Sequence, residues 1–344
     1  VVCANLTRLT IGEELPPPTP YSHTKITEIS EQFSVQWQKE PVYISQPREG
    51  DTSLVSYNGI AILLGNLENN LEARSLSYLD MATGELVKEN KAVNLRVNTV
   101  ALTSQRLLVG VDGTQKISGQ TVWGSSTVVA YNLATTDLLW QTKIPGARGI
   151  TRLFASDEFV TVQGNSSTYN YVLDAATGEI VEELPYSDFW WFEFDGVRYE
   201  EHNQSVRAIE LGSQKLRWVY AQNSTVPHIP FIDSETLVFR NGGSVSAHDT
   251  RSGRLLWQKG NLVRQIDIDG ETLFYLTADL RLSAVHKATG EEIGHIQFQM
   301  DGPPDYSNHS YLMTASEGMV LVYFGDSRQL YAFQFSPKAT HNDQ

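Results

Sequence analysis

Short apolar strands alternate with polar turns along most of the chain, and one such pattern recurs. It consists of an apolar strand, a turn that reads roughly Ala-Thr-Gly, and a second strand that often ends in tryptophan. Its copies lie at residues 76–87, 128–140, 171–181, 206–218, 245–257 and 282–293. A repeat of roughly 35–50 residues that holds only strand patterns is typical of a β-propeller blade, so the sequence predicts an all-β propeller.

The two ends of the chain each carry half of one further copy. Residues 33–37 read as a second strand with no turn before it, and residues 330–335 read as a first strand with no turn after it. We expect these halves to pair, because their union removes an open sheet edge. The positions that end the second strands are then Trp37, Lys88, Trp140, Glu182, Trp218, Trp257 and Gly294. The sequence therefore predicts seven four-stranded antiparallel blades, closed by pairing of the N-terminal and C-terminal strands.

One blade shows the expected four strands most clearly. They are Val263–Ile268, Thr272–Thr277, Leu282–Val285 and Glu291–Ile296, from the inner strand to the outermost. The pair Asp269-Gly270 is a strong hairpin signal, and Gly290 can take the positive φ that a tight turn needs. We expect the tryptophans of the repeat to pack between adjacent blades, where a large ring buries most area.

Composition limits the number of domains and the classes of partner. The chain has 344 residues, of which 41% are hydrophobic. This is enough for one propeller domain at residues 32–336, between an N-terminal tail with a proline-rich linker (1–31) and a C-terminal tail (337–344). The net charge of −14 argues against binding nucleic acid or an anionic membrane through a broad basic face. No stretch approaches the roughly 20 apolar residues of a membrane span, and we expect a monomer.

Cys3 is the only cysteine, so no internal disulfide can form. It lies near the start of the sequence and is followed by a stiff, extended segment at Pro16–Pro20. In a bacterial lipoprotein the acylated cysteine is the first mature residue, and a linker leads from it to the folded domain. Two interpretations stay open: lipid attachment at Cys3 of an extracytoplasmic protein, or an incidental thiol in a disordered tail.

The strand, Ala-Thr-Gly turn, strand and tryptophan together resemble the PQQ-type propeller repeat, and residues 171–180 (YVLDAATGEI) nearly match its consensus. The resemblance covers about residues 33–335. Within this family the chain is most similar to BamB-type outer-membrane assembly lipoproteins and to uncharacterised secreted relatives, which implies a non-catalytic scaffold. Quinoprotein alcohol dehydrogenases share the repeat but carry a vicinal cysteine pair over their cofactor. A chain with Cys3 alone cannot form that pair.

Hydrolytic and redox motifs are missing from the sequence, including Gly-x-Ser-x-Gly and His-Glu-x-x-His. Residues 267–271 offer several carboxylates, but they lack the ligand spacing of a calcium loop and lie where the blade needs a turn. We therefore expect no enzyme activity, no metal site and no cofactor.

Four residues take the same place when blades are aligned on their first hairpin turn. They stand five positions before Asp157, Asp195, Asp233 and Asp269, and they are Arg152, Trp190, His228 and Arg264. Because inner strands surround the propeller axis, these side chains could hold an anionic or aromatic group at the mouth of the funnel. The alternative is a solvated channel lined by polar residues.

Aromatic residues and long connections suggest where a protein partner binds. The run 188–194 is rich in rings, most of which belong in the core, while Trp190 and Trp191 are candidates for partner contact. Long connections between second and third strands, and one long link between blades, fall on one face of the propeller, either as a docking rim or through drift in loop length, which costs little stability. They are residues 65–73, 112–126, 163–168 and 300–310. Trp123, in the longest of them, is either tucked back over its blade or exposed as an anchor.

The most consistent function is a non-enzymatic, extracytoplasmic scaffold that binds a protein partner on the face with the long connections. In this interpretation the protein belongs to an envelope or cell-surface assembly, and a lipid on Cys3 is its one contact with a membrane. The alternative is a small-ligand or quinoprotein-type module that holds an anion in the axial funnel.

Overall fold

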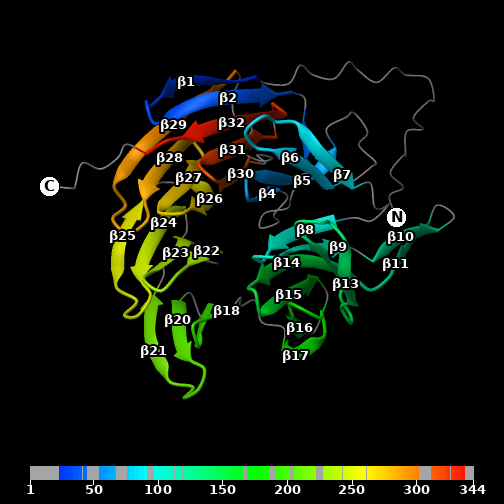
Figure 1. Ribbon diagram of the computed structural model, residues 1–344. Helices are drawn as coiled ribbons and strands as arrows, with labels where there is room; N and C mark the ends of the chain where they lie inside the picture. The colour runs from blue at the N-terminus through cyan, green and yellow to red at the C-terminus, as the bar shows by residue number, and fades with distance from the viewer. Residues whose placement is uncertain are drawn as a thin grey trace, which may run out of the picture.

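The computed structural model describes residues 23–40, 42–44, 54–66, 76–90, 97–111, 113–117, 120–165, 167, 169–185, 191–201, 205–221, 228–241, 243–260, 262–301, 311–325 and 327–337. Within these ranges the chain forms strands and turns only. Seven four-stranded antiparallel blades surround a common axis (Figure 1). The predicted fold class is confirmed.

The blades are numbered here in chain order, and their strands run from the axis outwards. Blade 1 holds β4 (Leu54–Tyr57), β5 (Ile60–Asn66), β6 (Leu76–Asp80) and β7 (Leu86–Asn90), and blade 2 holds β8 (Val97–Leu102), β9 (Arg106–Val111), β12 (Thr127–Asn132) and β13 (Leu138–Lys143). Blade 3 holds β14 (Gly149–Ala155), β15 (Phe159–Asn165), β16 (Tyr169–Asp174) and β17 (Ile180–Pro185), and blade 4 holds β18 (Trp191–Phe194), β19 (Val197–Glu201), β20 (Ser205–Glu210) and β21 (Leu216–Ala221).

The remaining blades follow the same order. Blade 5 holds β22 (His228–Ile232), β23 (Thr236–Asn241), β24 (Ser244–Asp249) and β25 (Leu255–Lys259), and blade 6 holds β26 (Val263–Asp269), β27 (Thr272–Thr277), β28 (Arg281–His286) and β29 (Glu292–Met300). Blade 7 holds β30 (Tyr311–Ser316), β31 (Met319–Phe324), β32 (Gln329–Phe335) and β2 (Phe33–Lys39). Outside this scheme lie β1 (Thr24–Ile29), β3 (Tyr43–Ile44), which pairs with β5, and the hairpin of β10 (Thr114–Ile117) and β11 (Gln120–Trp123).

Blade 7 closes the ring with strands from both ends of the chain. β2 pairs with β32 from Phe33 opposite Phe335 to Lys39 opposite Leu330. The ring of Phe33 packs on that of Phe335 with centroids 4.8 Å apart, inside a core that blades 6 and 7 share. The predicted pairing of residues 33–37 with residues 330–335 is confirmed.

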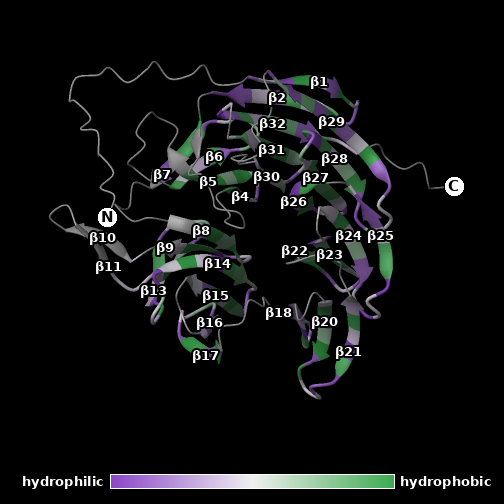
Figure 2. Ribbon diagram, turned by 180° about the vertical axis from the view of Figure 1, so that it is seen from behind, coloured by the Kyte–Doolittle hydropathy of each residue, from purple (hydrophilic) through white to green (hydrophobic). Residues whose placement is uncertain are grey.

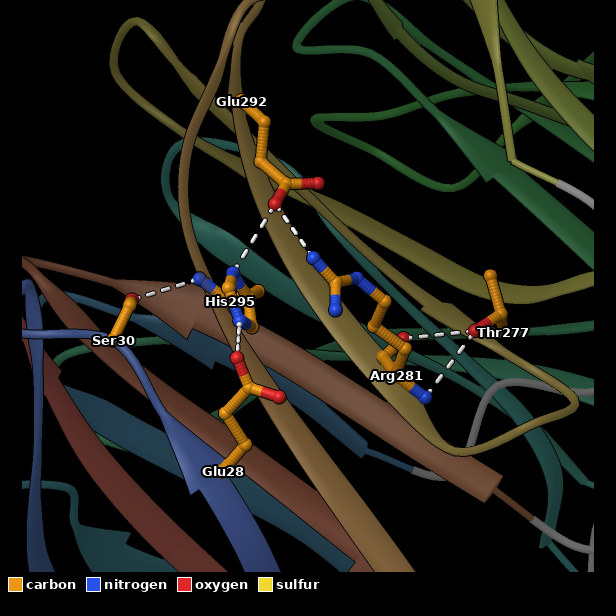
Figure 3. Close-up of polar contacts among 6 residues, drawn as sticks. All are labelled: Glu28, Ser30, Thr277, Arg281, Glu292 and His295. Atoms are coloured by element: carbon orange, nitrogen blue, oxygen red, sulfur yellow. Dashed lines mark hydrogen bonds and ion pairs between the residues drawn. The ribbon is translucent and has the colours of Figure 1, made fainter.

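β1 adds a fifth strand to the outer edge of blade 6, inside the segment that we expected to be tail and linker. It pairs with β29 from Thr24 opposite Met300 to Ile29 opposite Ile296. His295 lies between two carboxylates, with Nε2 2.8 Å from Glu28 on β1 and Nδ1 3.2 Å from Glu292 (Figure 3). This added strand covers the edge of blade 6, which would otherwise present unpaired backbone groups.

The tryptophans of the repeat join each blade to the next. Each indole N–H donates to a backbone carbonyl in the turn between the third and fourth strands of the following blade. The pairs are Trp37 with Met81 (2.8 Å), Trp140 with Ala175 (3.1 Å), Trp218 with Thr250 (3.0 Å) and Trp257 with Lys287 (2.7 Å). The ring then lies against a turn glycine with positive φ: Gly84, Gly178, Gly253 or Gly290. The expected packing of tryptophan between blades is confirmed, and any side chain at these glycines would clash with the ring.

Other residues occupy the tryptophan position in three blades. Lys88 donates instead to the Thr136 hydroxyl and lies 3.4 Å from the Thr135 carbonyl in the turn of blade 2. At Gly294, the start of β2 and the connection before it fill the space, since a Cβ there would lie 3.1 Å from both the Phe33 ring and the Ser30 hydroxyl oxygen. Glu182 is exposed, so the junction of blades 3 and 4 has no ring at this place.

In blade 6, burial is greatest in the two middle strands, and the inner strand β26 is half-buried along most of its length. β27 and β31 are buried along their whole length, whereas the outer strand β29 alternates between more and less exposed residues. Figure 2 shows the same alternation of hydrophobic and hydrophilic residues along the outer strands. The pattern is that of a sheet with neighbours on both faces and solvent at its outer edge.

Candidate interaction face and axial funnel

The longest predicted connection, residues 112–126, contains a β-hairpin that the sequence pattern did not predict. β10 and β11 pair from Thr114 opposite Trp123 to Ile117 opposite Gln120. Threonine, isoleucine, valine and tryptophan favour strands, which accounts for the pairing. The hairpin projects away from the ring between β9 and β12 (Figure 1).

Two glycines form the neck of this hairpin. The Gly124 N–H donates to the Gly113 carbonyl at 2.7 Å, and a Cβ on Gly113 would lie 2.3 Å from the Gly124 oxygen. Next to the neck, Ser126 is fully buried and hydrogen-bonds through its backbone to Ile144 and Ala147 in the link to blade 3. The base of the hairpin is therefore held firmly by the ring.

Several predicted contact residues lie partly or wholly outside the described residues. Trp123 ends β11, and Trp191 begins β18 opposite Glu200, but the structure describes only their backbones. Trp190 and Cys3 fall outside the described residues altogether. The roles proposed for these four residues stay predictions.

The strand ends that flank the other predicted long connections lie on the hairpin's face, since these connections join second to third strands or one blade to the next. Most of residues 65–73 and of residues 300–310 lie outside the described part of the chain. In residues 163–168, Ser167 is buried, and its hydroxyl donates to the Tyr169 carbonyl at 2.7 Å. In the described part of this face, the hairpin is therefore the one large projection.

Three of the four predicted funnel residues lie on described inner strands, each at or beside an irregularity in the strand pairing. Arg152 on β14 lies opposite Gln163, and His228 on β22 lies opposite Arg240. Arg264 lies within an irregularity of β26, between Val263 and Gln265, which pair with consecutive residues of β27. Irregularities also adjoin Arg152, between Ile150 and Arg152, and His228, between His228 and Phe231. Aligning blades by counting from the turn misses such bulges, because each inserts one residue into a strand.

The Arg264 side chain contains a buried polar atom without a hydrogen-bond partner. Its Nε atom is buried without a hydrogen-bond partner, and its backbone carbonyl accepts a 2.9 Å hydrogen bond from Arg240. A buried polar atom without a partner is uncommon in folded proteins. Of these two arginines, Arg264 has a buried side-chain atom without a partner, whereas Arg152 is half-buried on its strand.

Two carboxylates near the axis bind backbone groups of the neighbouring blade. Asp267 accepts hydrogen bonds at 2.8 Å from the N–H groups of Ile268 and Ala315, and Asp269 accepts one at 2.6 Å from Gly318. Burial of the carboxyl group raises the pKa of Asp267 to about 6. These acids join blade 6 to blade 7, and the sequence analysis had assigned them only to a turn.

A lysine forms the corresponding polar contact between blades 5 and 6. The Lys287 ammonium lies 2.9 Å from both Asp233 and Glu271, and 5.1 Å from the centre of the Phe231 ring. Burial alone would lower the pKa of Lys287, but the hydrogen bonds to Glu271 and Asp233 outweigh it and raise that pKa. The ammonium thus stays charged and fills the space between the two blades.

Within the described ranges, no group of three histidine, cysteine, aspartate or glutamate residues is placed to hold a metal ion. Across the same residues, no helix is long and apolar enough to cross a membrane.

Comparisons with known proteins agree with the architecture. A profile of the family described as "Outer membrane protein assembly factor BamB" matches residues 199–338. The crystal structure of BamB from Moraxella catarrhalis matches with a TM-score of 0.51 and 11% identity, over 88% of this chain and 100% of that chain. A chain of the structure titled "Crystal Structure of Mitotic Checkpoint Complex" matches with a TM-score of 0.58 and 12% identity, over 97% of this chain and 98% of that chain. No curated protein matches.

The profile match and the likeness to BamB support a PQQ-like β-propeller family, as the repeat predicted. At 11% and 12% identity the two structures show the fold alone.

Proposed function

We propose that this protein is a non-enzymatic, extracytoplasmic scaffold that binds a protein partner through the face bearing the β10–β11 hairpin. The observation that carries the proposal is the hairpin itself, which projects from a closed ring on a neck of two touching glycines. A protruding element on a rigid support loses little conformational freedom when it binds, and such elements commonly carry function.

The proposal extends to the envelope. The matching profile describes an outer-membrane assembly factor, which supports an extracytoplasmic assembly as the setting. Lipid attachment at Cys3 is part of this proposal, and mass spectrometry of the protein isolated from its own cells tests it. A peptide that contains unmodified Cys3 would refute the anchor without affecting the hairpin.

Site-specific photo-crosslinking tests the binding face. We expect a photo-reactive amino acid at Gln115 on β10 to capture one protein reproducibly in the cells that produce this propeller. The matched control is Gly212, an exposed turn position on the opposite face, where an added Cβ meets nothing within 4 Å. Equal capture at both positions, or capture at Gly212 alone, would contradict the proposed face.

Arg264 supports a second candidate function, a small anion held in the axial funnel. Its buried Nε atom has no partner, and a bound carboxylate or phosphate would supply one. Pyrroloquinoline quinone with calcium is the probe for the quinoprotein form of this alternative. A concentration-dependent rise in the melting temperature that is lost on Arg264→Ala would favour the ligand-binding function, whereas the scaffold proposal expects no rise.

A further inference from the structure

A pocket of about 400 Å³ opens between blades 4 and 5, on the face opposite the hairpin. Turns between first and second strands and between third and fourth strands meet there. Its lining residues are Phe194, Asp195, Val197, Tyr199, Arg217, Ser234, Thr250 and Arg251. A volume of this size is within the range of small-molecule sites.

The next junction of the same ring shows why this space is open. Thr250 in blade 5 and Lys287 in blade 6 hold equivalent positions, since each accepts the indole N–H of the preceding blade, from Trp218 and Trp257. Each also donates its own backbone N–H to the first turn of its blade, Thr250 to Glu235 at 3.0 Å and Lys287 to Glu271 at 2.9 Å.

The two side chains at this position differ in length and charge. Lys287 extends across the junction of blades 5 and 6 and places its ammonium 2.9 Å from Asp233. Thr250 is too short to extend in this way, and its hydroxyl donates to the nearby Asp233 carbonyl at 3.1 Å. The junction of blades 4 and 5 therefore lacks the internal cation that occupies the following junction.

The open pocket has an apolar floor and a cationic rim. Val197 and Tyr199 are both buried, with 1% of each residue exposed, and Phe194 adds a third apolar wall. Arg217 and Arg251 supply two guanidinium groups, and Asp195 is the one acid of the lining.

Neither guanidinium is strongly neutralised. The Arg217 side chain lies 3.5 Å from Glu210, with 33% and 45% of the two side chains exposed, which is a weak ion pair. Among the described residues, no carboxylate forms an ion pair with Arg251. In a chain with a net charge of −14, two arginines over an apolar floor are a local exception.

We propose that this pocket binds a small organic anion, a carboxylate or phosphate carried on an apolar body about the size of one aromatic ring. The ring packs against Phe194, Val197 and Tyr199, and the anionic group accepts hydrogen bonds from Arg217 and Arg251. Guanidinium groups suit this task because they present several donors in one plane to two oxygens at once. The site is separate from the proposed partner face.

Calorimetric titration of the full chain with phenyl phosphate tests the proposal. We expect saturable binding, with no binding of benzyl alcohol, which lacks the charge, or of benzylamine, which reverses it. Titration with inorganic phosphate measures how much of the binding is due to the anion alone. We expect Arg251→Gln to weaken the binding of phenyl phosphate by about tenfold or more, because it removes a charged hydrogen-bond donor.

Two further variants test whether binding depends on this pocket or only on positive charge near it. Arg254→Gln removes an exposed arginine from the same turn but outside the lining, and it is expected to leave binding unchanged. Thr250→Lys copies the side chain found at the following junction and is expected to abolish binding while the melting temperature stays near that of the wild type. The proposal is overturned if phenyl phosphate does not bind at millimolar concentration, if benzyl alcohol binds equally, or if Arg254→Gln weakens binding as much as Arg251→Gln. Should Thr250→Lys fail to fold, the two arginine variants decide alone.

Discussion

Asp267 provides a quantitative test of how blades 6 and 7 are joined. Burial of its carboxyl group raises its pKa from an ordinary value of 3.8 to about 6, although the residue as a whole keeps some exposure. The folded protein thus holds this proton more tightly than the unfolded chain. Its contribution to stability is fully present below pH 3.8 and is lost as the pH rises towards 6. A difference of about two pKa units corresponds to about 3 kcal/mol.

The assay is urea unfolding of the wild type and of Asp267→Asn between pH 4 and pH 7. An asparagine does not titrate, so the variant lacks this pH-dependent contribution to the free energy of unfolding. It also loses one acceptor, because its amide nitrogen cannot accept from Ile268 or Ala315 as both carboxylate oxygens do. Because part of this contribution is already lost at pH 4, we expect the wild type to lose about 2 kcal/mol more than the variant between pH 4 and pH 7.

Other carboxylates act in the opposite direction but are common to both proteins. Hydrogen bonds from Ser104, Thr177 and Ser252 lower the pKa values of Asp157, Asp174 and Asp249, respectively. Their stabilisation is lost as the pH falls through the lowered pKa, in the variant and the wild type alike. The difference between the two curves therefore isolates Asp267. A difference that stays constant from pH 4 to pH 7 would refute the reasoning.

Three further predictions concern the ring and the hairpin. Trp257→Ala is expected to lower the free energy of unfolding, measured by chemical denaturation, by about 3–5 kcal/mol. Trp257→Phe keeps most of the buried area and loses mainly the hydrogen bond to Lys287, so it is expected to lower it by about 1 kcal/mol. Equal losses for the two variants would contradict the role of the indole N–H. Removal of residues 329–344 takes β32 from blade 7 and is expected to lower the melting temperature sharply, so an unchanged melting curve would disprove the closure. Trp123→Ala is expected to leave stability nearly unchanged and to weaken partner capture; a loss of about 3–5 kcal/mol would instead place this ring in the core.

The fold was predictable because each copy of the repeat marks where its strands lie along the chain. Six turns of similar sequence, each followed by a position that often holds tryptophan, determine where blades begin and end. The half-copies at residues 33–37 and 330–335 then leave one way to close the ring. The order of four strands in a blade follows from hairpin turns such as Asp269-Gly270, so these features need only local information.

The features that the sequence analysis missed depend on contacts between distant segments. β1 is a six-residue strand outside the repeat, and it forms because β29 offers a free edge. The bulge at Arg264 shifts one strand against its neighbour without any signal in composition. The pocket lies where Thr250 takes the position that Lys287 holds in the next blade. The effect of this difference can be recognised only by comparing the two junctions in the structure.

The hairpin β10–β11 is an intermediate case. Its length and position were predictable from the gap in the repeat at residues 112–126. Its pairing was not, because the segment lies outside the repeat that marks the strands of the blades. The contact between Gly113 and Gly124 explains these glycines, since any side chain at the neck would meet the opposite backbone.

The most direct test of the scaffold proposal is removal of the hairpin from the intact ring. Deleting residues 114–123 joins Gly113 to Gly124, whose N–H already lies 2.7 Å from the Gly113 carbonyl, so the ring is expected to melt as before. The measurement is the size of the native complex that each protein forms in extracts of its own cells. We expect a larger complex for the full chain and a free monomer for the deletion variant. A deletion variant that melts normally and stays in the same complex would contradict the claim that this hairpin binds the partner.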